Sequence, residues 1–532
     1  MDIGRALSWT AERYPGRPAV GGERAFTWRE WDARTNRIAR AIGALGAARG
    51  DRVCLCMSNG EAMAATHLAG QKLGVLSTPL NSRYAPEELA YCLQDADPKV
   101  VVSDDATAGL LREALELLDP DRRRFALVHD GDDRPDGALG FDEALADHGD
   151  GAIDVEIGPD DPSVMLYTAG TTGRPKGVPR TQRNEHAAAE AHVMQARYGP
   201  WEATLGAMPM YHTMGLRSLL AMVVVGGKFV AMPTFKAAPA LELIARERVT
   251  ALYLVPTAFW ALVQEGGLAE AGAHVRRLAY AGAAMTPTLC GQLQEALQPD
   301  VFVNHYGSTE VYTFCVEEDA AAHPGSAGRP GLHSRIRLVR ADGGDDPAGP
   351  DDEVAPGETG EIVASLRSPE AFQGYWHRPE ADERALRDGW YFTGDLGHAD
   401  DEGRIHVSGR VDDMIITGGE NVHPLEVEDA LAACPDVKEV AVAGVQEDKW
   451  GHAVTAFVVA GGDEPEAAAR RIADWVRSDS GLTAYKRPKR IVVLDEIPKS
   501  PVGKILRRKL VAGEYSPLGD AETGAHREGA GA

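Results

Sequence analysis

A glycine- and threonine-rich loop is the feature of the sequence best suited to chemistry. Residues 167–177 read YTAGTTGRPKG and directly follow the short apolar run of residues 164–166. Glycine lets backbone N–H groups close around a polyphosphate, threonine hydroxyls add donors, and Lys176 adds a positive charge. The spacing differs from the GxxxxGK[ST] pattern of a P-loop. The loop is therefore a candidate phosphate cradle, although runs of this composition also occur as plain surface loops.

Four further motifs follow this loop in order along the chain. They are YGSTE at residues 306–310, YFTGD at 391–395, GRVDD at 409–413 and PVGK at 501–504. Taken singly, the first two predict turns, the third a surface ion pair and the fourth a solvated lysine. Each of the five motifs, which follow one another in order along the chain, contains hydroxyl or charged side chains.

Together these motifs resemble those of the adenylate-forming superfamily, which includes acyl-CoA synthetases, luciferases and peptide-synthetase adenylation domains. The resemblance covers residues 160–508 and extends more weakly to residue 1. It implies an enzyme that uses ATP and Mg²⁺ to convert a carboxylic acid to an acyl adenylate. An ionised carboxylate that attacks the α-phosphate needs no general base, so the site must supply charge neutralisation and alignment.

The resemblance assigns a role to individual residues. Glu310 should hold Mg²⁺, Thr309 should contact phosphate, and Tyr306 should pack on adenine. Asp395 should accept hydrogen bonds from both ribose hydroxyls, as an ionised carboxylate can, and Arg410 should support the ribose or a phosphate. The further nucleotide contacts that it implies are Thr168, Gly170, Thr171, Thr172, Gly173, Lys176, Gly282, Ala283 and Asn304.

A lysine near the end of the chain implies a mobile lid. By the resemblance, Lys504 bridges the attacking and leaving oxygens during adenylate formation. A thiol must later reach the acyl adenylate, so part of the enzyme has to move. In the family a small C-terminal domain rotates about one hinge residue, matched here by Asp412. The rotation withdraws Lys504 and presents Gly418 and Gly419 to a pantetheine tunnel.

Residues 409–428, 448–451 and 485–490 are most similar to the 4-chlorobenzoate–CoA ligase branch of the superfamily. That branch implies four contacts to coenzyme A. Arg83, Arg487 and Lys489 are the cations expected to bind its phosphates, and Trp450 is the ring expected to stack. A plain basic surface cluster is the alternative. An enzyme that passes its acid to a carrier protein or a separate transferase is the second candidate function.

Two other functions agree less well with the sequence than acid–CoA ligation. Intact Glu310 and Lys504 argue against a non-catalytic nucleotide-binding relative. No feature of the sequence points specifically to luciferase-like oxidation.

The acid pocket is indicated by two segments. Residues 208–212 (MPMYH) match a family segment whose histidine, here His212, lies between the acid and ATP sites; a core histidine is the alternative. Amino-acid-activating relatives have an aspartate at the position of Thr213, whereas residues 211–215 include no acidic residue, so the resemblance disfavours an α-amino acid as substrate. Ala191 stands where the chlorobenzoate enzyme has an aromatic residue, and Gly282 also lines the pocket, so we expect an aryl or bulky cyclic acid.

Composition limits the class of protein. The formal charge is 55 − 80 = −25, which disfavours binding to nucleic acid and to anionic membranes. The six cysteines have no metal-ligand spacing, and the longest apolar run, residues 219–225, is far too short to span a membrane. A cytoplasmic enzyme is expected, and a homodimer is compatible with these features.

Alternating strand and helix signals predict an α/β fold. Strands are expected at residues 52–57, 249–254, 277–280 and 301–304, and helices at 61–73, 257–264 and 286–297. This order predicts mostly parallel sheets covered by helices in a large N-terminal domain, residues 1–411. A small, mobile α+β lid is expected over residues 412–515, followed by a disordered tail at 516–532.

Overall fold

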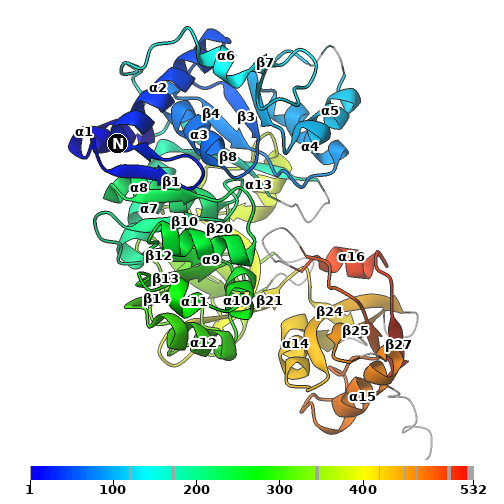
Figure 1. The fold of residues 1–532 in the computed structure, drawn as a ribbon. Helices are drawn as coiled ribbons and strands as arrows, with labels where there is room; N and C mark the ends of the chain where they lie inside the picture. The colour runs from blue at the N-terminus through cyan, green and yellow to red at the C-terminus, as the bar shows by residue number, and fades with distance from the viewer. Residues whose placement is uncertain are drawn as a thin grey trace, which may run out of the picture. The chain divides into compact units, whose positions relative to one another are not determined.

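The structure is a computed structural model of the 532-residue chain. It describes residues 2–119, 121, 123–168, 174–341, 347–417, 420–447, 451–462, 464–499 and 505–523. The chain divides into two compact units (Figure 1). Residues 1–336 and 364–391 form the first unit, and residues 337–363 and 392–532 form the second.

A nine-stranded sheet in the first unit carries most of the candidate site. Its order is β16-β15-β14-β13-β12-β10-β11-β1-β2. Its strands are β1 (Pro18–Gly21), β2 (Phe26–Thr27), β10 (Ala203–Gly206), β11 (Lys228–Ala231), β12 (Ala251–Leu254), β13 (Arg277–Ala281), β14 (Val301–Tyr306), β15 (Cys315–Glu317) and β16 (Arg329–Pro330). The pairings from β1 through β14 are parallel, and the edge strands β2, β15 and β16 pair antiparallel.

A seven-stranded sheet, also in the first unit, ends in the hairpin that holds the glycine-rich loop. Its order is β7-β6-β5-β3-β4-β8-β9. The strands are β3 (Arg52–Cys56), β4 (Leu76–Pro79), β5 (Val100–Asp104), β6 (Ala126–Asp130), β7 (Leu139–Gly140), β8 (Pro162–Thr168) and β9 (Lys176–Thr181). Only β8 and β9 pair antiparallel among the described strands of this sheet.

Thirteen helices lie in the described part of the first unit. They are α1 (Ile3–Arg13), α2 (Trp28–Ala44), α3 (Glu61–Leu73), α4 (Pro86–Ala96), α5 (Ala108–Leu117), α6 (Phe141–Leu145), α7 (Gln182–Gln195), α8 (Thr213–Val225), α9 (Ala237–Arg246), α10 (Pro256–Glu265), α11 (Leu268–Ala271), α12 (Pro287–Leu297) and α13 (Pro379–Ala385). Helix α7 packs on α8, and α8 contacts β10, β11 and β12. Helices α9–α12 pack against one another and are drawn in green in Figure 1.

Local sequence explains where the site helices begin. The Thr181 side chain accepts a hydrogen bond from the Asn184 backbone, and the Asn184 side chain accepts one from the Thr181 backbone, so α7 starts at a reciprocal cap. Helices α10 and α12 each have proline in the first turn, where the missing N–H costs nothing. These caps fix where the helices leave the carboxyl ends of the strands.

The second unit contains two sheets. One has the order β17-β18-β20-β19, with β21 beside β20; β19 and the parts of β18 and β20 within residues 364–391 are assigned to the first unit. The other has the order β23-β22-β25-β26-β27, with β24 beside β25. The strands are β17 (Ile336–Val339), β18 (Gly360–Ser365), β19 (Leu386–Arg387), β20 (Trp390–Ala399), β21 (Ile405–Arg410), β22 (Ile415–Thr417), β23 (Glu420–Val422), β24 (Val437–Glu447), β25 (Gly451–Ala460), β26 (Arg490–Val493) and β27 (Gly519–Glu522).

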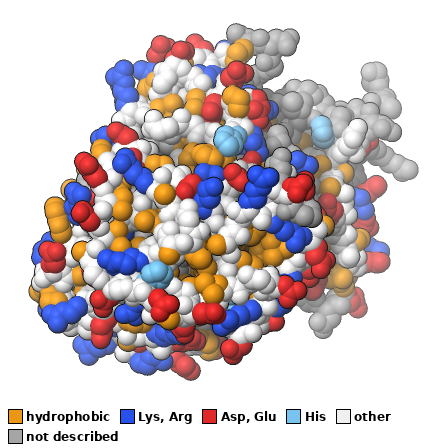
Figure 2. All heavy atoms as spheres, turned by 90° about the horizontal axis from the view of Figure 1, so that it is seen from above, with side chains coloured by type: hydrophobic (Ala, Val, Ile, Leu, Met, Phe, Trp, Pro, Cys, Tyr) orange, Lys and Arg blue, Asp and Glu red, His pale blue; other side chains and the backbone are white. Residues whose placement is uncertain are grey.

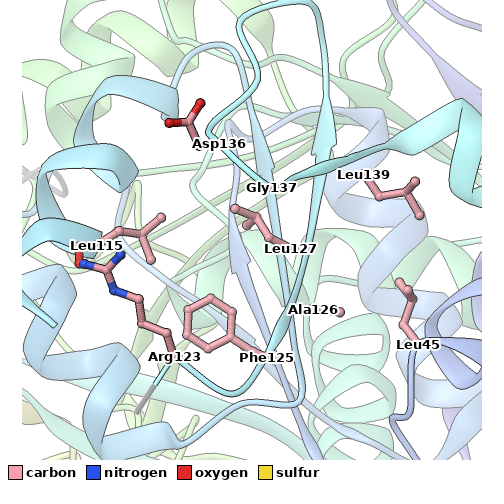
Figure 3. A pocket seen from close by; sticks show the side chains of 9 residues that line it. All are labelled: Leu45, Leu115, Arg123, Phe125, Ala126, Leu127, Asp136, Gly137 and Leu139. Carbon is pink, nitrogen blue, oxygen red and sulfur yellow. The ribbon is translucent and has the colours of Figure 1, made fainter. Parts of the chain in front are cut away.

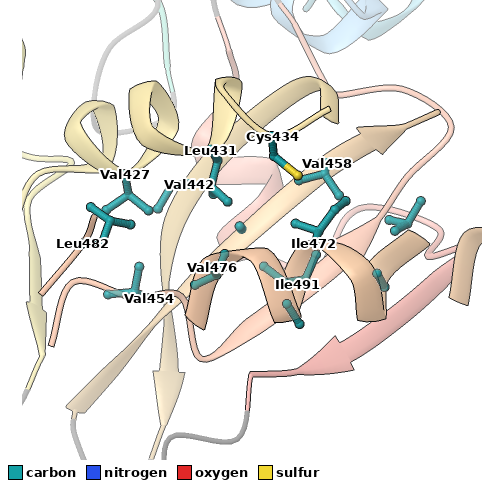
Figure 4. Close-up of a cluster of buried hydrophobic side chains, with 14 of the residues drawn as sticks. Val427, Leu431, Cys434, Val442, Val454, Val458, Ile472, Val476, Leu482 and Ile491 are labelled. Atoms are coloured by element: carbon teal, nitrogen blue, oxygen red, sulfur yellow. The ribbon is translucent and has the colours of Figure 1, made fainter. Parts of the chain in front are cut away.

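Three helices cover the second of these sheets: α14 (Pro424–Ala432), α15 (Pro465–Ser478) and α16 (Arg507–Val511). Figure 4 shows the core beneath α14 and α15, in which Val427 and Leu431 of α14 and Ile472 and Val476 of α15 point toward the strands. Each of these four side chains is fully buried. The amphipathic pattern of α15 is thus satisfied within this unit alone.

The expected elements of the first unit are confirmed. The helix predicted at residues 61–73 is α3 with the same bounds, and β3, β12, β13, β14, α10 and α12 each lie within three residues of their expected limits. The α/β class with mostly parallel sheets is also confirmed.

Two expectations about the C-terminal part need comment. Part of the expected tail instead forms β27, which pairs antiparallel with β26, with Arg490 opposite Glu522 and Val492 opposite Asp520. Arg490 Nε also donates to Asp520 Oδ2 at 3.1 Å. Residues 524–532 lie outside the described chain. The lid limits of 412–515 stay a prediction. No helix among the described residues is long and apolar enough to cross a membrane.

Candidate functional site

The ends of the glycine-rich loop are fixed by an antiparallel hairpin. Thr168 at the end of β8 lies opposite Lys176 at the start of β9, and five further residue pairs continue the hairpin. Met165 and Leu166, in β8, are fully buried, so the hairpin is anchored in the core. Residues 169–173, which include the expected Gly170, Thr171, Thr172 and Gly173, lie outside the described chain.

Residues 306–310 form a compact turn at the carboxyl end of β14. The Ser308 hydroxyl accepts hydrogen bonds from the Glu310 and Val311 backbones at 3.2 and 3.3 Å. Gly307 is required, because a Cβ there would lie 2.2 Å from the Tyr312 carbonyl oxygen. Tyr306 is half-buried, with its ring edge-on to Phe314. The sequence pattern thus produces a turn that holds Thr309 and Glu310 at the ligand-binding edge of a parallel sheet.

Glu310 lies in a short line of interacting side chains. The Tyr375 hydroxyl donates to Glu310 Oε1 at 2.7 Å, and Lys176 Nζ lies 4.5 Å from the centre of the Tyr375 ring. Burial, with the Glu310 charge, raises the pKa of Tyr375, so the phenol remains a donor. Lys176 and Glu310, 134 positions apart in the sequence, thus share one neighbouring ring.

A fully buried arginine ties this turn to two other segments. Arg180 Nη1 donates to the carbonyl oxygens of Thr309 at 3.1 Å, Glu310 at 3.4 Å and Glu370 at 2.9 Å. Its Nε contacts Glu185 Oε1 at 2.5 Å. Its guanidinium lies 3.4 Å from the centre of the Tyr312 ring. One side chain therefore fixes the backbone on which the expected metal and phosphate ligands lie.

A second buried arginine extends this network. Arg217 on α8 bonds Thr313 Oγ1 at 2.5 Å and lies 3.5 Å from Glu370 Oε2. Glu370 Oε1 lies 3.3 Å from His333, which raises the pKa of that histidine. Arg180, Arg217, Glu185 and Glu370 are each at most 2% exposed and balance in charge. Such paired charges are costly to break.

His212 begins α8 beside the site strands. Its backbone N–H donates to the Pro209 carbonyl at 3.0 Å, and its ring lies against Tyr211. Burial lowers the pKa of His212 to about 4, so the ring is neutral near pH 7. Arg83 is exposed, and its charge acts on Tyr211, whose pKa burial nevertheless raises. The structure thus places the expected Arg83 close to the segment that carries His212.

Two other expected positions lie at the ends of neighbouring strands. Gly282 follows β13 with φ +90°, a region that favours glycine, and Gly282 and Ala283 are both exposed. Asn304, within β14, is buried, and its amide donates to the Ser326 carbonyl at 2.7 Å. Gly282 and Ala283 therefore offer open backbone to a ligand, whereas the Asn304 amide nitrogen is engaged within the protein.

Ala191 lies on the inner face of α7 and is fully buried. The residue after it, His192, packs on His305 of β14 with ring centres 5.1 Å apart. An acid can reach this face only if neighbouring side chains move, because no solvent reaches the Ala191 methyl group.

The ribose and hinge candidates belong to the second unit. Arg410 and Asp395 are register partners of β21 and β20, and Arg410 Nη1 contacts Asp395 Oδ1 at 2.5 Å. Both side chains are partly exposed, at 28% and 17%. Asp412 is exposed in the turn between β21 and β22, as expected of a hinge position.

The expected CoA cations of the second unit lie on the segment that precedes β26. Arg487 Nε donates to the Leu482 carbonyl at 2.9 Å, and Lys489 Nζ donates to the Ala484 carbonyl at 3.3 Å. Burial, with the Arg487 charge, lowers the pKa of Lys489. The two cations are therefore close enough for their charges to interact, and both could attract the same anionic group. Gly418, Gly419, Trp450 and Lys504 lie outside the described residues.

Surface shape and charge do not by themselves mark the site. A hollow of about 330 Å³ lies between β6, β7 and α5 (Figure 3), lined by Leu115, Phe125, Leu127, Leu139 and others. None of the residues assigned to ATP, acid or CoA lines it. On the face drawn in Figure 2, basic and acidic side chains are interspersed, so the charge of −25 forms no single patch there.

Glu310 fits the coordination habits of Mg²⁺. This ion is commonly held by one or two carboxylates together with substrate phosphate oxygens. Tyr375 donates to Oε1, and no donor to Oε2 is found among the residues that the structure describes. The described chain holds no cluster of three metal-ligating side chains. One carboxylate oxygen beside a phosphate-binding loop is thus a suitable ligand when ATP supplies the others.

Sequence reasoning missed the side chains that support the site. They are Arg180, Glu185, Arg217, Glu370 and Tyr375. Arg180 alternates with Val178, a buried strand position, which is a sequence signal for an inward-facing charge. Glu370 and Tyr375 lie in a segment of irregular structure, where no periodicity reveals which side chains face inward.

Comparison with known proteins agrees with this geometry. The model of the AMP-binding enzyme family matches residues 7–376, and that of the AMP-binding enzyme C-terminal domain matches 426–504. The chain is 34% identical to the long-chain-fatty-acid–CoA ligase FadD13 of Mycobacterium tuberculosis, covering 91% of this chain and 92% of that one. It is 32% identical to 4-chlorobenzoate–CoA ligase of Arthrobacter sp, covering 95% and 94%.

A solved structure extends the likeness to three dimensions. The ATP-bound MatB of Rhodopseudomonas palustris superposes with a TM-score of 0.84 at 28% identity, covering 96% of this chain and 99% of that chain. The expected similarity to the chlorobenzoate branch is confirmed, and a fatty-acid ligase is similar to the same degree. The chain therefore belongs to the AMP-binding, adenylate-forming family of enzymes, among the acyl- and aryl-CoA ligases.

Proposed function

We propose that the protein is an ATP-dependent ligase that joins a carboxylic acid, aryl or bulky cyclic, to coenzyme A through an acyl adenylate. The observation that carries this proposal is the turn of residues 306–310 at the end of β14, with Glu310 held by Tyr375 beside Lys176. The similarity of nearly the whole chain to CoA ligases supports the same reading.

In this proposal the first unit aligns the reactants for adenylation. The acid carboxylate attacks the α-phosphate, a bond forms between them, and pyrophosphate leaves. Lys176 and the backbone N–H groups that follow β8 neutralise phosphate charge, and Glu310 is the proposed ligand of Mg²⁺, which when bound neutralises more of it. His212, neutral because burial lowers its pKa, lies beside α8 without adding a charge that would compete with these cations.

The second unit carries the other proposed contacts. Asp395, which Arg410 contacts, is the proposed acceptor of hydrogen bonds from the ribose hydroxyls. Arg487 and Lys489 are the proposed cations for CoA phosphates. The thiol then attacks the acyl carbonyl, a thioester forms, and AMP leaves with its phosphate group.

The experiment that tests this function measures both half-reactions of the full chain. Fatty, aryl and cyclic acids are offered with ATP and Mg²⁺, and pyrophosphate release is followed; CoA is then added, and AMP and thioester are measured. We expect acid-dependent pyrophosphate release and a CoA-dependent thioester. Pyrophosphate release without any thioester would favour the carrier-protein alternative. No acid-dependent release with any acid would overturn the proposal.

Ala191→Phe tests the proposed bulk of the acid. If Ala191 lines the acid pocket, a phenyl ring there should lower kcat/KM for large acids by about 1–3 kcal/mol through overpacking, while small benzoates should improve. The melting temperature must be measured beside the rates, since a folding defect lowers every rate alike. Ala187→Phe, at a buried position on the same helix, is the matched control. If the folded variant kept the wild-type order of preference among large and small acids, Ala191 would not line the acid pocket.

A further inference from the structure

Two buried histidines beside the proposed acid pocket have no hydrogen-bond partners. His192 on α7 and His305 on β14 are 0% and 2% exposed. All four of their ring nitrogens lack a partner in the structure. A buried polar atom left without a partner costs about 1–3 kcal/mol, so native proteins seldom keep several together unless water or a ligand uses them.

The two imidazoles belong to one aromatic cluster. Their ring centres are 5.1 Å apart, and each also contacts Tyr253 of β12, at 4.6 Å from His192 and 5.6 Å from His305. The Tyr253 hydroxyl interacts with Arg217, which opposes the rise that burial causes in the pKa of that tyrosine. Three elements thus bring polar groups into one apolar interior.

The position of the cluster connects it to the acid site. His305 lies in register with Ala281, the residue before Gly282, and directly precedes the turn of residues 306–310. His192 directly follows Ala191. The imidazoles therefore lie behind the same strand ends and the same helix face that the proposed acid pocket uses, where ligands bind in sheets of this kind.

The charge state of the rings limits what they can bind. Burial lowers the pKa of both histidines, and the Arg217 charge lowers both further, so each ring is neutral and offers one N–H donor and one acceptor nitrogen. Arg217 already faces Glu370 and Thr313. The positive charge of Arg217 disfavours an ammonium group of a ligand. Because Glu370 and Thr313 already contact the guanidinium, it has little capacity for a carboxylate of a ligand. A neutral hydroxyl, which both donates and accepts, matches the pair.

We propose that His192 and His305 form a hydrogen-bonding subsite that selects acids carrying a hydroxyl group at the end remote from the reacting carboxylate. The proposal rests on the function proposed above and names the class of substrate for that same site. Because neither imidazole is exposed, at least one ring must turn when the acid enters. The energetic gain is the pairing of ring nitrogens that are otherwise unsatisfied.

The test compares acids that differ only by one group. Pyrophosphate release by the full chain is measured with hydroxy- and methyl-substituted benzoates, cinnamates and arylacetates, paired at the same ring position. The wild type should prefer the hydroxy acid of at least one pair by about tenfold or more in kcat/KM, because a site built to bond a hydroxyl rejects the analogue that lacks it. Equal rates within every pair, or preference for an acid with a second carboxylate, would overturn the proposal.

Variants separate selection from structure. His305→Leu and His192→Leu should bring that preference below about twofold, because an apolar pocket cannot strongly distinguish a methyl from a hydroxyl. His305→Gln, which restores a donor and an acceptor, should recover part of it. His67→Leu removes a buried histidine of α3, outside this cluster, and should keep the wild-type preference. A uniform loss with all acids in the leucine variants would mean a structural role only.

The two proposals fail in different ways. If the wild type activates no acid, the proposed function is wrong and the subsite is lost with it. If the wild type activates acids and the leucine variants keep the wild-type preference, the function stands and the subsite alone is wrong.

Discussion

The charged side chains of the candidate site differ in burial between the two units. In the first unit, Arg180, Glu185, Arg217 and Glu370 are at most 2% exposed and bond mainly to one another and to backbone carbonyls. In the second unit, Asp395 and Arg410 are partly exposed, and Arg487 and Lys489 contact only carbonyl oxygens among described residues. Buried charges that are already paired hold a backbone in place, whereas accessible cations stay ready for a ligand.

This difference suggests a division of tasks between the units. Adenylation requires the phosphates to be aligned without reorganisation of the protein, which suits a turn fixed by a buried network. Binding of a second substrate requires charged groups that can exchange solvent for phosphate, which suits cations at a partly exposed segment. The comparison predicts that substitutions in the two units will have different consequences.

Loss of Arg180 should have the largest effect on stability. Arg180→Met leaves Glu185 buried without its cation, and breaking a buried ion pair in this way typically costs about 3–5 kcal/mol. The urea midpoint of the first unit should fall and adenylation should fall with it. Arg180→Met combined with Glu185→Leu should regain much of the lost stability, because no unpaired charge remains.

An exposed pair in the second unit provides the control for Arg180. Arg471 contacts Asp436 at 2.7 Å with half of the arginine side chain exposed. Arg471→Met should leave the urea midpoint unchanged, since solvent-exposed pairs contribute little. Equal losses in both variants would remove the proposed difference between the units.

Acid should destabilise the first unit through the buried His67. Burial lowers the pKa of His67 to about 4 from an ordinary value of 6.5. The imidazole of His67 therefore binds a proton below about pH 6.5 in the unfolded chain but only below about pH 4 in the folded chain. Stability falls as the pH falls through this window, by about 2 kcal/mol at pH 5 for this group alone.

The measurement that checks this is urea unfolding of the full chain at pH 7 and pH 5, with His67→Gln beside the wild type. The variant should lose less stability on acidification, although it starts lower because Ser77 loses its partner. If the free energy of unfolding fell equally from pH 7 to pH 5 in wild type and variant, His67 would have the same pKa in the folded and unfolded chains, which contradicts this prediction.

Removal of the accessible cations should have the smallest effect on the fold and a selective effect on kinetics. Arg487→Ala with Lys489→Ala should raise the KM for CoA about tenfold and weaken its salt dependence, because two phosphate-binding charges are lost. Acid-dependent pyrophosphate exchange should change less than twofold. An unchanged KM for CoA would favour the carrier-protein alternative.

The sequence was sufficient to predict helices and strands with a clear apolar periodicity. The helix at residues 61–73 and the strands around 277–280 and 301–304 follow from periodicity, because apolar side chains must face one core. Glu310 and Lys176 come from motifs that resemble those of the family, and their roles as metal and phosphate contacts stay predictions. The network around Arg180 and the pair of His192 and His305 could not be predicted, because they join residues more than a hundred positions apart, which no local pattern encodes.

The C-terminal segment shows a different limit of local patterns. Residues 519–522 are small or acidic and resemble a frayed end, yet they form β27 by pairing with β26. The hydrogen bonds of that strand come from its partner and not from its own side chains. Composition alone therefore misjudges a short edge strand.

Separate measurement of the two half-reactions in Lys504→Ala tests the central claim most directly. Lys504 lies outside the described residues, and its role comes from the motif at 501–504. Loss of one charge partner of the transition state should slow acid-dependent pyrophosphate exchange by about two to three orders of magnitude. Thioester formation from supplied acyl adenylate and CoA should remain close to the wild-type rate. Equal loss in both half-reactions would contradict the assignment of adenylation and thioester formation to different sets of residues.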